Sequence, residues 1–273
     1  MNYPFSIWSQ FYHPLSPEEA ILEFEKDGMT HIELSHEHST SLLERSPDHL
    51  ATGRDFAAFI QAHGITARQG HLAFPNHFVT DPNFFEMLVR QIELYGAIGI
   101  ERAVLHVDTI SPELSTEDLI AQNAEMLKKL LARIEHVNVI LCLENCRGVT
   151  RSVDELLELI RLVDSPKLGI CLDTGHLNIT KTDSQADFIR KAGSRLKALH
   201  IADNEGVNDQ HLAPFGCGTV NFFEVVKALD EIGYDGIFNY EIPGESCRCP
   251  LPLRHEKVKW IRAGYEHVMK REN

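Results

Sequence analysis

Short apolar runs and amphipathic stretches alternate along the whole chain. Eight runs of four to six residues are largely apolar, and several are continuous, as is typical of parallel strands covered on both faces. These runs are Phe5–Trp8, His31–Leu34, Ile65–Gln69, Ala103–Val107, Val139–Leu143, Leu168–Leu172, Leu196–Ile201 and Ile237–Ile242. The helical patterns between them include Pro17–Lys26, Phe84–Tyr95, Glu117–Ile134, Val153–Leu162 and Phe222–Glu231.

Local signals support this division. Ser16-Pro17-Glu18-Glu19 and Ser115-Thr116-Glu117-Asp118 are typical helix starts, with acidic residues in the first turn. Glycines follow several helical patterns, where a left-handed C-terminal cap is expected: Gly28, Gly64, Gly99 and Gly233. Strand–helix units with no dividing linker predict one α/β domain over residues 1–273, a (β/α)₈ TIM barrel. A doubly wound sheet is the alternative, but no glycine-rich phosphate loop follows the first strand.

Composition agrees with a globular α/β protein. The 273 residues are 43% hydrophobic and 24% charged, and no apolar run approaches the roughly 20 residues that cross a bilayer. The first residues lack the basic and apolar regions of a secretory signal. Six cysteines are too sparse for a disulfide scaffold, so we expect a reducing, cytoplasmic location.

The charge balance bears on partners. A net charge of −14 disfavours a nucleic-acid partner, because such binding depends on a basic surface. The tail Arg254–Arg271 is mildly basic, but Glu256 and Glu266 interrupt it, and an amphipathic outer helix explains it better.

Polar residues gather where the predicted strands end. Their positions are His71, His106, Glu144-Asn145, Asp173, His200 and Glu241. In a (β/α)₈ barrel these ends form the functional face, and buried carboxylates there need a compensating cation. We therefore predict a divalent metal held by Glu144, Asp173, His200 and Glu241. The mostly oxygen ligand set suits manganese, magnesium or cobalt, whereas further histidines would favour zinc or more than one metal.

The same residues carry a resemblance to a known family. Leu143-Glu144-Asn145, Asp173-Thr174-Gly175-His176, His200–Asn204 with Asp209–Leu212, Gly216–Thr219 and Tyr240-Glu241 follow one another on successive strands. In this order the chain resembles the xylose-isomerase-like TIM-barrel superfamily over nearly its whole length. That group includes sugar and sugar-phosphate isomerases and epimerases, inosose dehydratases, and apurinic/apyrimidinic endonucleases.

The resemblance implies roles for these residues. Glu144, Asp173, His200 and Glu241 match the single-metal set of the epimerases, with Glu144, Glu241 and His176 as catalytic residues. Proton transfer would pass through an enediolate stabilised by the metal. Additional metal or substrate positions, which match the endonuclease trinuclear site, are His71, His106, His176, Asp209 and His211.

Two departures affect specificity. No arginine follows His200 closely, where epimerases of this group hold a substrate oxygen, since the stretch is Asp203–Gly206. The loop Leu72–Pro75 has no basic residue of the kind that penetrates DNA. We also find no convincing phosphate cradle, which favours a free sugar or polyol over a sugar phosphate.

Three activities and one binding role therefore stay open. The leading interpretation is an isomerase or epimerase of a small carbohydrate; the alternatives are an endonuclease-type phosphodiesterase, an inosose-dehydratase-like lyase and a non-catalytic sugar sensor. Expected pocket residues are Trp8, Phe11, Glu33, Phe74 and Asn145, while His36 and His38 are expected in an exposed loop. Relatives in this superfamily often pair, so a homo-oligomer is compatible with the sequence, which identifies no interface.

Overall fold

Eight parallel strands form one sheet in the computed structural model, which describes residues 3–74, 79 and 81–270. The strands are β1 (Phe5–Trp8), β2 (His31–Leu34), β3 (Thr66–His71), β4 (Arg102–Leu105), β5 (Ile140–Glu144), β6 (Leu168–Asp173), β7 (Leu196–His200) and β8 (Phe238–Tyr240). Their spatial order is β7-β6-β5-β4-β3-β2-β1-β8. A parallel bridge between Ile201 and Tyr240 brings the two ends of the sheet together. The predicted (β/α)₈ TIM barrel is thus confirmed.

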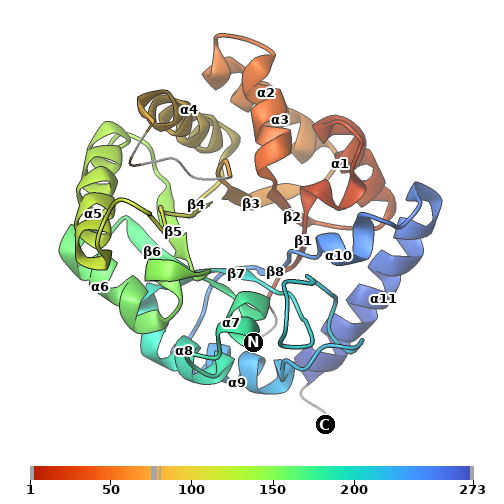
Figure 1. The fold of residues 1–273 in the computed structure, drawn as a ribbon. Coiled ribbons are helices and arrows are strands. Elements are labelled where there is room, and N and C mark those ends of the chain that lie inside the picture. The colour runs from red at the N-terminus through yellow and green to blue at the C-terminus, as the bar shows by residue number, and fades with distance from the viewer. Residues whose placement is uncertain (1–2, 75–78, 80, 271–273) are drawn as a thin grey trace.

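Helices surround the sheet on its outer side (Figure 1). In the described residues they are α1 (Pro17–Lys26), α2 (His36–Glu44), α3 (His49–Ala62), α4 (Pro82–Ile98), α5 (Thr116–Arg133), α6 (Val153–Val163), α7 (Thr174–Thr180), α8 (Gln185–Ala192), α9 (Phe222–Ile232), α10 (Pro243–Ser246) and α11 (Leu251–Lys270). Short 3₁₀ turns lie at Ser9–Tyr12, Gly148–Thr150 and Gly193–Arg195. None of these helices is long and apolar enough to cross a membrane.

The predicted helix boundaries follow from capping chemistry. Ser16 and Glu19 form a reciprocal capping box at α1, and the Ser115 side chain accepts a hydrogen bond from the Asp118 amide at α5. All four glycines expected at helix ends have positive φ, from 64° at Gly28 to 95° at Gly99. The basic tail forms α11, as the sequence predicted, up to Lys270; Arg271 lies outside the described residues.

The segment after β2 corrects one expectation. His36 and His38 were expected in an exposed loop, but Ser35 caps a helix there and both histidines lie in the first turn of α2. His38 is buried and its ring contacts Ser9 Oγ at 2.8 Å and the Leu15 carbonyl at 3.1 Å. The pattern of apolar residues did not predict α2, because most of its residues are polar. Leu42 and Leu43 are its only buried large apolar residues.

The core has two parts. Most buried apolar residues lie between the barrel and the helices, whereas Val104, Cys142, Cys171 and Ala198 form a small separate cluster. These four residues lie on adjacent strands β4 to β7, and small side chains there fill the barrel interior. The interior below the polar strand ends is therefore packed with buried side chains, and the polar residues lie above it at one end of the barrel.

Close packing between α3 and α4 gives a test of the fold. A Cβ on Gly53 would lie 2.7 Å from Ala97 Cβ and 3.0 Å from the Leu94 carbonyl oxygen. Helix propensity alone would favour alanine there by about 1 kcal/mol. The contact with backbone outweighs this gain, so we expect Gly53→Ala to lower the free energy of unfolding by about 1–3 kcal/mol in urea denaturation.

A control on the same helix separates the two effects. Asp55 is exposed, and Asp55→Ala should change the free energy of unfolding by less than about 0.5 kcal/mol. A Gly53→Ala variant as stable as the parent protein would contradict the packing described for α3 and α4.

Candidate active site

The carboxyl ends of the strands bring the predicted ligands together. His71, Glu144, Asp173 and His200 are the last residues of β3, β5, β6 and β7. His106 and Glu241 come directly after β4 and β8. Because all strands run in parallel, the six side chains meet at one end of the barrel.

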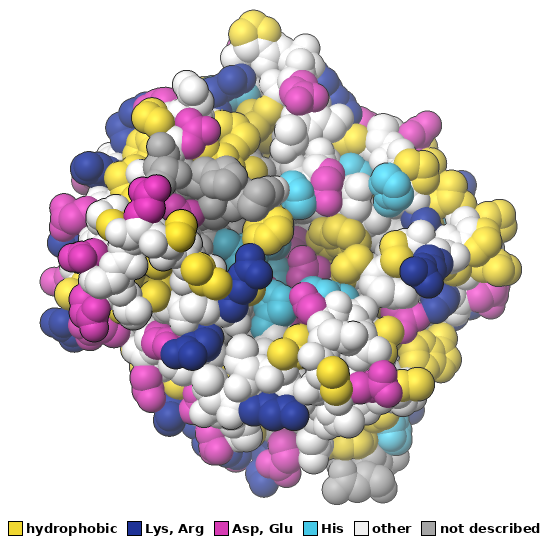
Figure 2. Space-filling model, viewed as in Figure 1, with side chains coloured by type: hydrophobic (Ala, Val, Ile, Leu, Met, Phe, Trp, Pro, Cys, Tyr) yellow, Lys and Arg dark blue, Asp and Glu magenta, His cyan; other side chains and the backbone are white. Residues whose placement is uncertain are grey.

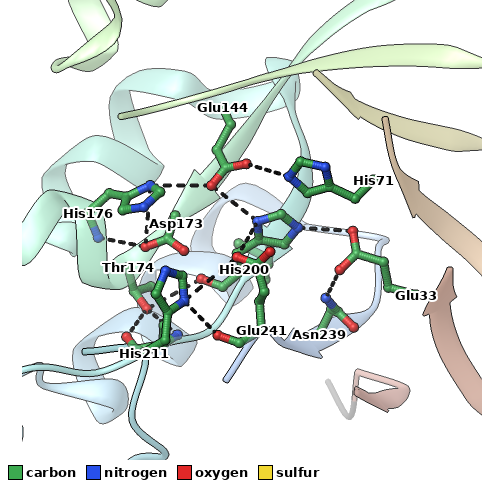
Figure 3. Close-up of polar contacts among 12 residues, drawn as sticks. Glu33, His71, Glu144, Asp173, Thr174, His176, His200, His211, Asn239 and Glu241 are labelled. Atoms are coloured by element: carbon green, nitrogen blue, oxygen red, sulfur yellow. Dashed lines mark hydrogen bonds and ion pairs between the residues drawn. The ribbon is translucent and has the colours of Figure 1, made fainter. Parts of the chain in front are cut away.

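Four of these side chains form a central cluster. Glu144, Asp173, His200 and Glu241 each offer one donor atom, and these atoms lie within 4.8 Å of one another. His200 Nδ1 lies 3.2 Å from Glu144 Oε1 and 3.2 Å from Glu241 Oε2 (Figure 3). His200 Nδ1, Asp173 Oδ2 and both Glu144 carboxylate oxygens are buried without a hydrogen-bond partner among the described residues. Buried polar atoms are normally paired, so this convergence fits a divalent cation.

Glu144 lies between two pairs of histidines. Its Oε2 atom is 3.0 Å from His106 Nε2 and 3.5 Å from His71 Nε2. Its Oε1 atom is 3.3 Å from His176 Nδ1 and 3.2 Å from His200 Nδ1. A carboxylate with nitrogen donors on both sides has the arrangement of a group that can bridge two cations.

Backbone carbonyls fix the orientation of three peripheral histidines. The Nδ1 atoms of His71, His176 and His211 lie 2.7 Å, 2.9 Å and 2.9 Å from the carbonyl oxygens of Leu72, Asn145 and Glu241. An Nδ1–H donated to a carbonyl leaves the lone pair on Nε2. The Nε2 atoms of His176 and His211 face Asp209 Oδ2 at 3.2 Å and 3.0 Å. The structure thus brings every additional residue suggested by the resemblance to this end of the barrel, around the central four.

Glu33 supports His200 from the opposite side of the barrel. Its Oε1 atom accepts a hydrogen bond from His200 Nε2 at 3.0 Å and one from Gln69 Nε2 at 3.1 Å. Its Oε2 atom accepts one from Asn239, whose own Oδ1 accepts from Ser6 Oγ at 2.8 Å. Glu33 is fully buried and does not line the cavity, which corrects its expected pocket role. It directs His200 Nδ1 toward the central cluster.

Asn145 and Phe11 are corrected in the same way. Asn145 is fully buried and binds the backbone of Asp173 through both side-chain atoms, at 2.7 Å and 3.0 Å. Phe11 is fully buried in the hydrophobic core, where its ring packs edge-to-face on Tyr12. Strand-end position alone does not tell whether a side chain faces the cavity or the layer below it.

A cavity of about 810 Å³ opens above the cluster. Trp8 and Phe74 line it, as the sequence predicted, although Pro75 in the same loop lies outside the described residues. His36 and Arg147 also line it and were not predicted to do so. Figure 2 shows histidine and acidic side chains gathered in the hollow on this face.

Charge interactions keep two central carboxylates ionised. Burial alone would raise the pKa of Glu144, but the charges of His200 and His106 hold that pKa well below its usual range. Burial likewise opposes ionisation of Glu241, and His200 and His211 lower its pKa. Burial raises the pKa of Asp173. Glu144 and Glu241 therefore stay ionised as long as a positive charge lies beside them.

Comparison with known proteins agrees with this geometry. The profile of the xylose isomerase-like TIM barrel family matches residues 22–270. The chain is 33% identical over 171 residues to a probable endonuclease 4 of Mesomycoplasma hyopneumoniae, covering 56% of this chain and 58% of that protein. It is 32% identical over 120 residues to a D-psicose 3-epimerase of Enterocloster bolteae, covering 42% and 38%.

A crystal structure of a D-tagatose 3-epimerase-like protein has the same fold. It superposes with a TM-score of 0.79 at 23% identity and covers 98% of each chain. The chain spans about half the length of the curated relatives it matches, from 50% to 58% for the first three.

The contact between Glu33 and His200 gives a prediction about metal affinity. In Glu33→Gln the amide accepts the His200 Nε2 proton less strongly, so His200 Nδ1 is a poorer and less well oriented ligand. We expect the affinity for Mn²⁺ or Zn²⁺ to fall by about 10–100-fold, measured by competition with a chromophoric chelator.

Glu93→Gln is the matched control. Glu93 contacts His49 at 2.8 Å on the outer helices, so this variant should bind the metal as the parent does. Equal affinities in the Glu33→Gln variant and the parent would show that Glu33 does not act through His200.

Proposed function

Because the chain belongs to the xylose isomerase-like TIM barrel family, we propose that it is a divalent-metal-dependent isomerase or epimerase of a small carbohydrate. One observation carries this proposal: the carboxylates of Glu144 and Glu241 each lie 3.2 Å from His200 Nδ1, at the floor of an 810 Å³ cavity. Paired carboxylates beside a metal ligand suit proton transfer at carbon. Similarity to a D-psicose 3-epimerase supports the same class.

Glu144, Asp173, His200 and Glu241 would hold the metal. Three carboxylates and one imidazole suit manganese, magnesium or cobalt, and the neighbouring histidines extend the range to zinc. The bound cation would polarise a substrate carbonyl and so acidify the adjacent C–H bond.

Glu241 is the stronger candidate for the base that moves the proton. Its side chain is 14% exposed, and its ion-pair contacts with described residues all use Oε2, which leaves Oε1 for a substrate proton. Glu144 is only 1% exposed, and both of its oxygens face imidazoles. Glu144 would therefore return or receive a proton only when one of these contacts opens. His176, at the cavity wall, would hydrogen-bond a substrate oxygen.

The cavity favours a small substrate. Its volume suits one small molecule, and Trp8 and Phe74 offer apolar faces to the C–H groups of a carbohydrate. The net charge of −14 disfavours a nucleic-acid partner.

Hydrogen–deuterium exchange tests this function. The protein, reconstituted with Mn²⁺, is incubated in D₂O with ketoses, aldoses, inososes, sugar acids and sugar phosphates. We expect one carbon-bound proton next to the carbonyl to exchange, as followed by NMR. Glu241→Gln should slow the exchange about 10²–10⁴-fold, because it removes the candidate base and one of the four residues that would hold the metal.

Two controls accompany this experiment. Glu93→Gln should exchange at the parent rate, and protein treated with a chelator should not exchange. Absence of exchange across the whole panel with the metal-loaded protein would contradict the proposed function.

A second candidate function is an endonuclease-type phosphodiesterase with more than one metal. The fixed Nε2 atoms of His71, His176 and His211, with Glu144 between two histidine pairs, specifically favour it. Several cations can activate water and stabilise a leaving oxygen. The similarity to a probable endonuclease 4 supports the same candidate function.

Metal content and cleavage test this second candidate. It requires more than one metal per chain by inductively coupled plasma mass spectrometry, a loss of metal in His106→Ala, and cleavage of a duplex with an abasic site. A single metal per chain that is retained in His106→Ala, without cleavage, would exclude it.

A further inference from the structure

Arg147 is a positively charged residue at the cavity that forms no ion pair with a described carboxylate. Among the described residues that line the cavity it is the only lysine or arginine. It is exposed and follows Glu144 by three residues, in the loop between β5 and α6. No described carboxylate forms an ion pair with it, whereas Arg151 in the same loop pairs with Glu155 at 3.0 Å.

The loop that carries Arg147 is fixed by close backbone contacts. Gly148 has φ of 59°, and a Cβ there would lie 1.8 Å from the Thr109 carbonyl oxygen. That oxygen accepts a hydrogen bond from the Val149 amide at 3.2 Å, and the Thr150 hydroxyl donates to the Arg147 carbonyl at 3.2 Å. The backbone of Arg147 is thus held against the loop after β4, at the cavity wall.

The charges around Arg147 indicate what it can bind. The other charged groups of the described cavity wall, apart from histidines, are acidic: Asp108, Glu113, Glu144, Asp209 and Glu241. A metal in the central cluster would neutralise Glu144 and Glu241, and Asp209 faces His176 and His211. No ion pair joins Arg147 to Asp108, Glu113 or any other described carboxylate, so among the described residues its guanidinium stays available to a ligand. A guanidinium presents a planar set of donors that matches a carboxylate or phosphate in two parallel hydrogen bonds.

We propose that Arg147 binds an anionic end group of the substrate, so that the substrate is a sugar acid or a sugar phosphate. This inference rests on the proposed function and defines its substrate class. Arg147 and Glu241 line the same cavity of about 810 Å³, so one small molecule can place its anionic group at Arg147 and its reacting carbon at Glu241. This proposal departs from the sequence-based prediction of a free sugar or polyol, which was drawn from the lack of a phosphate cradle.

Binding measurements with the Mn²⁺-loaded full chain test Arg147. Isothermal titration calorimetry compares a neutral ketose with the ketose phosphate and the keto sugar acid of the same carbon skeleton. We expect one anionic ligand to bind about 10–100-fold more tightly than the neutral one, the strength of a charge-assisted hydrogen bond. The phosphate and carboxylate arms identify which group is recognised.

Two arginine variants separate recognition from overall charge. Arg147→Gln should remove the preference for the anionic ligand, whereas Arg151→Gln, which loses the same charge from the same loop, should keep it. Direct binding of the anion to the metal would be unaffected by Arg147→Gln. Both residues are exposed, and circular dichroism with thermal melting checks that each variant is folded.

The outcomes distinguish this inference from the proposed function. Equal affinity for neutral and anionic ligands in the parent protein, or an equal loss in both variants, would overturn the role of Arg147. Binding and exchange of the anionic substrate at unchanged affinity and rate in Arg147→Gln would leave the proposed function standing and remove this inference. Tight, Arg147-dependent binding of an anionic ligand without deuterium exchange would support the subsite and contradict the isomerase function.

Discussion

The burial of several carboxylates at one end of a barrel is the constraint on which this site depends. Glu144 and Asp173 are almost completely removed from solvent, and Glu241 is largely so. Uncompensated charges in such surroundings cost several kcal/mol each. Histidines supply part of the compensation, but the donor atoms that converge without hydrogen-bond partners point to a cation as the remainder. This arrangement supports the proposed metal centre.

The barrel supports this centre from strands that are far apart in the sequence. Glu33 on β2 reaches His200 on β7 across the interior, and Ser6, Gln69 and Asn239 hold Glu33 in place. A ligand that is oriented from across the barrel cannot rotate without disturbing several strands. This rigidity fixes which nitrogen of His200 faces the central cluster.

The same scaffold is compatible with two chemistries, and their difference lies in the peripheral residues. The central four residues are those that we propose for proton transfer at carbon. His71, His106, Asp209 and His211 would extend the donor set toward several cations. Arg147 lines the cavity on a loop that Gly148 holds against Thr109. Membership in the family therefore limits the class of reaction. The number of bound metals and the contacts made by the loops would decide which reaction of that class is catalysed.

The sequence alone determined the barrel, the strand-end position of the ligands and the helix caps, because these depend on local periodicity and capping chemistry. Ser16 with Glu19, and the glycines at Gly28 and Gly99, act through neighbouring residues and are visible in the sequence. Only the tertiary structure decided that Glu33 and Asn145 lie below the cavity, that Phe11 belongs to the core, and that Arg147 lines the cavity. Those assignments depend on the direction of a side chain relative to strands and loops distant along the chain, and local sequence carries no signal for it.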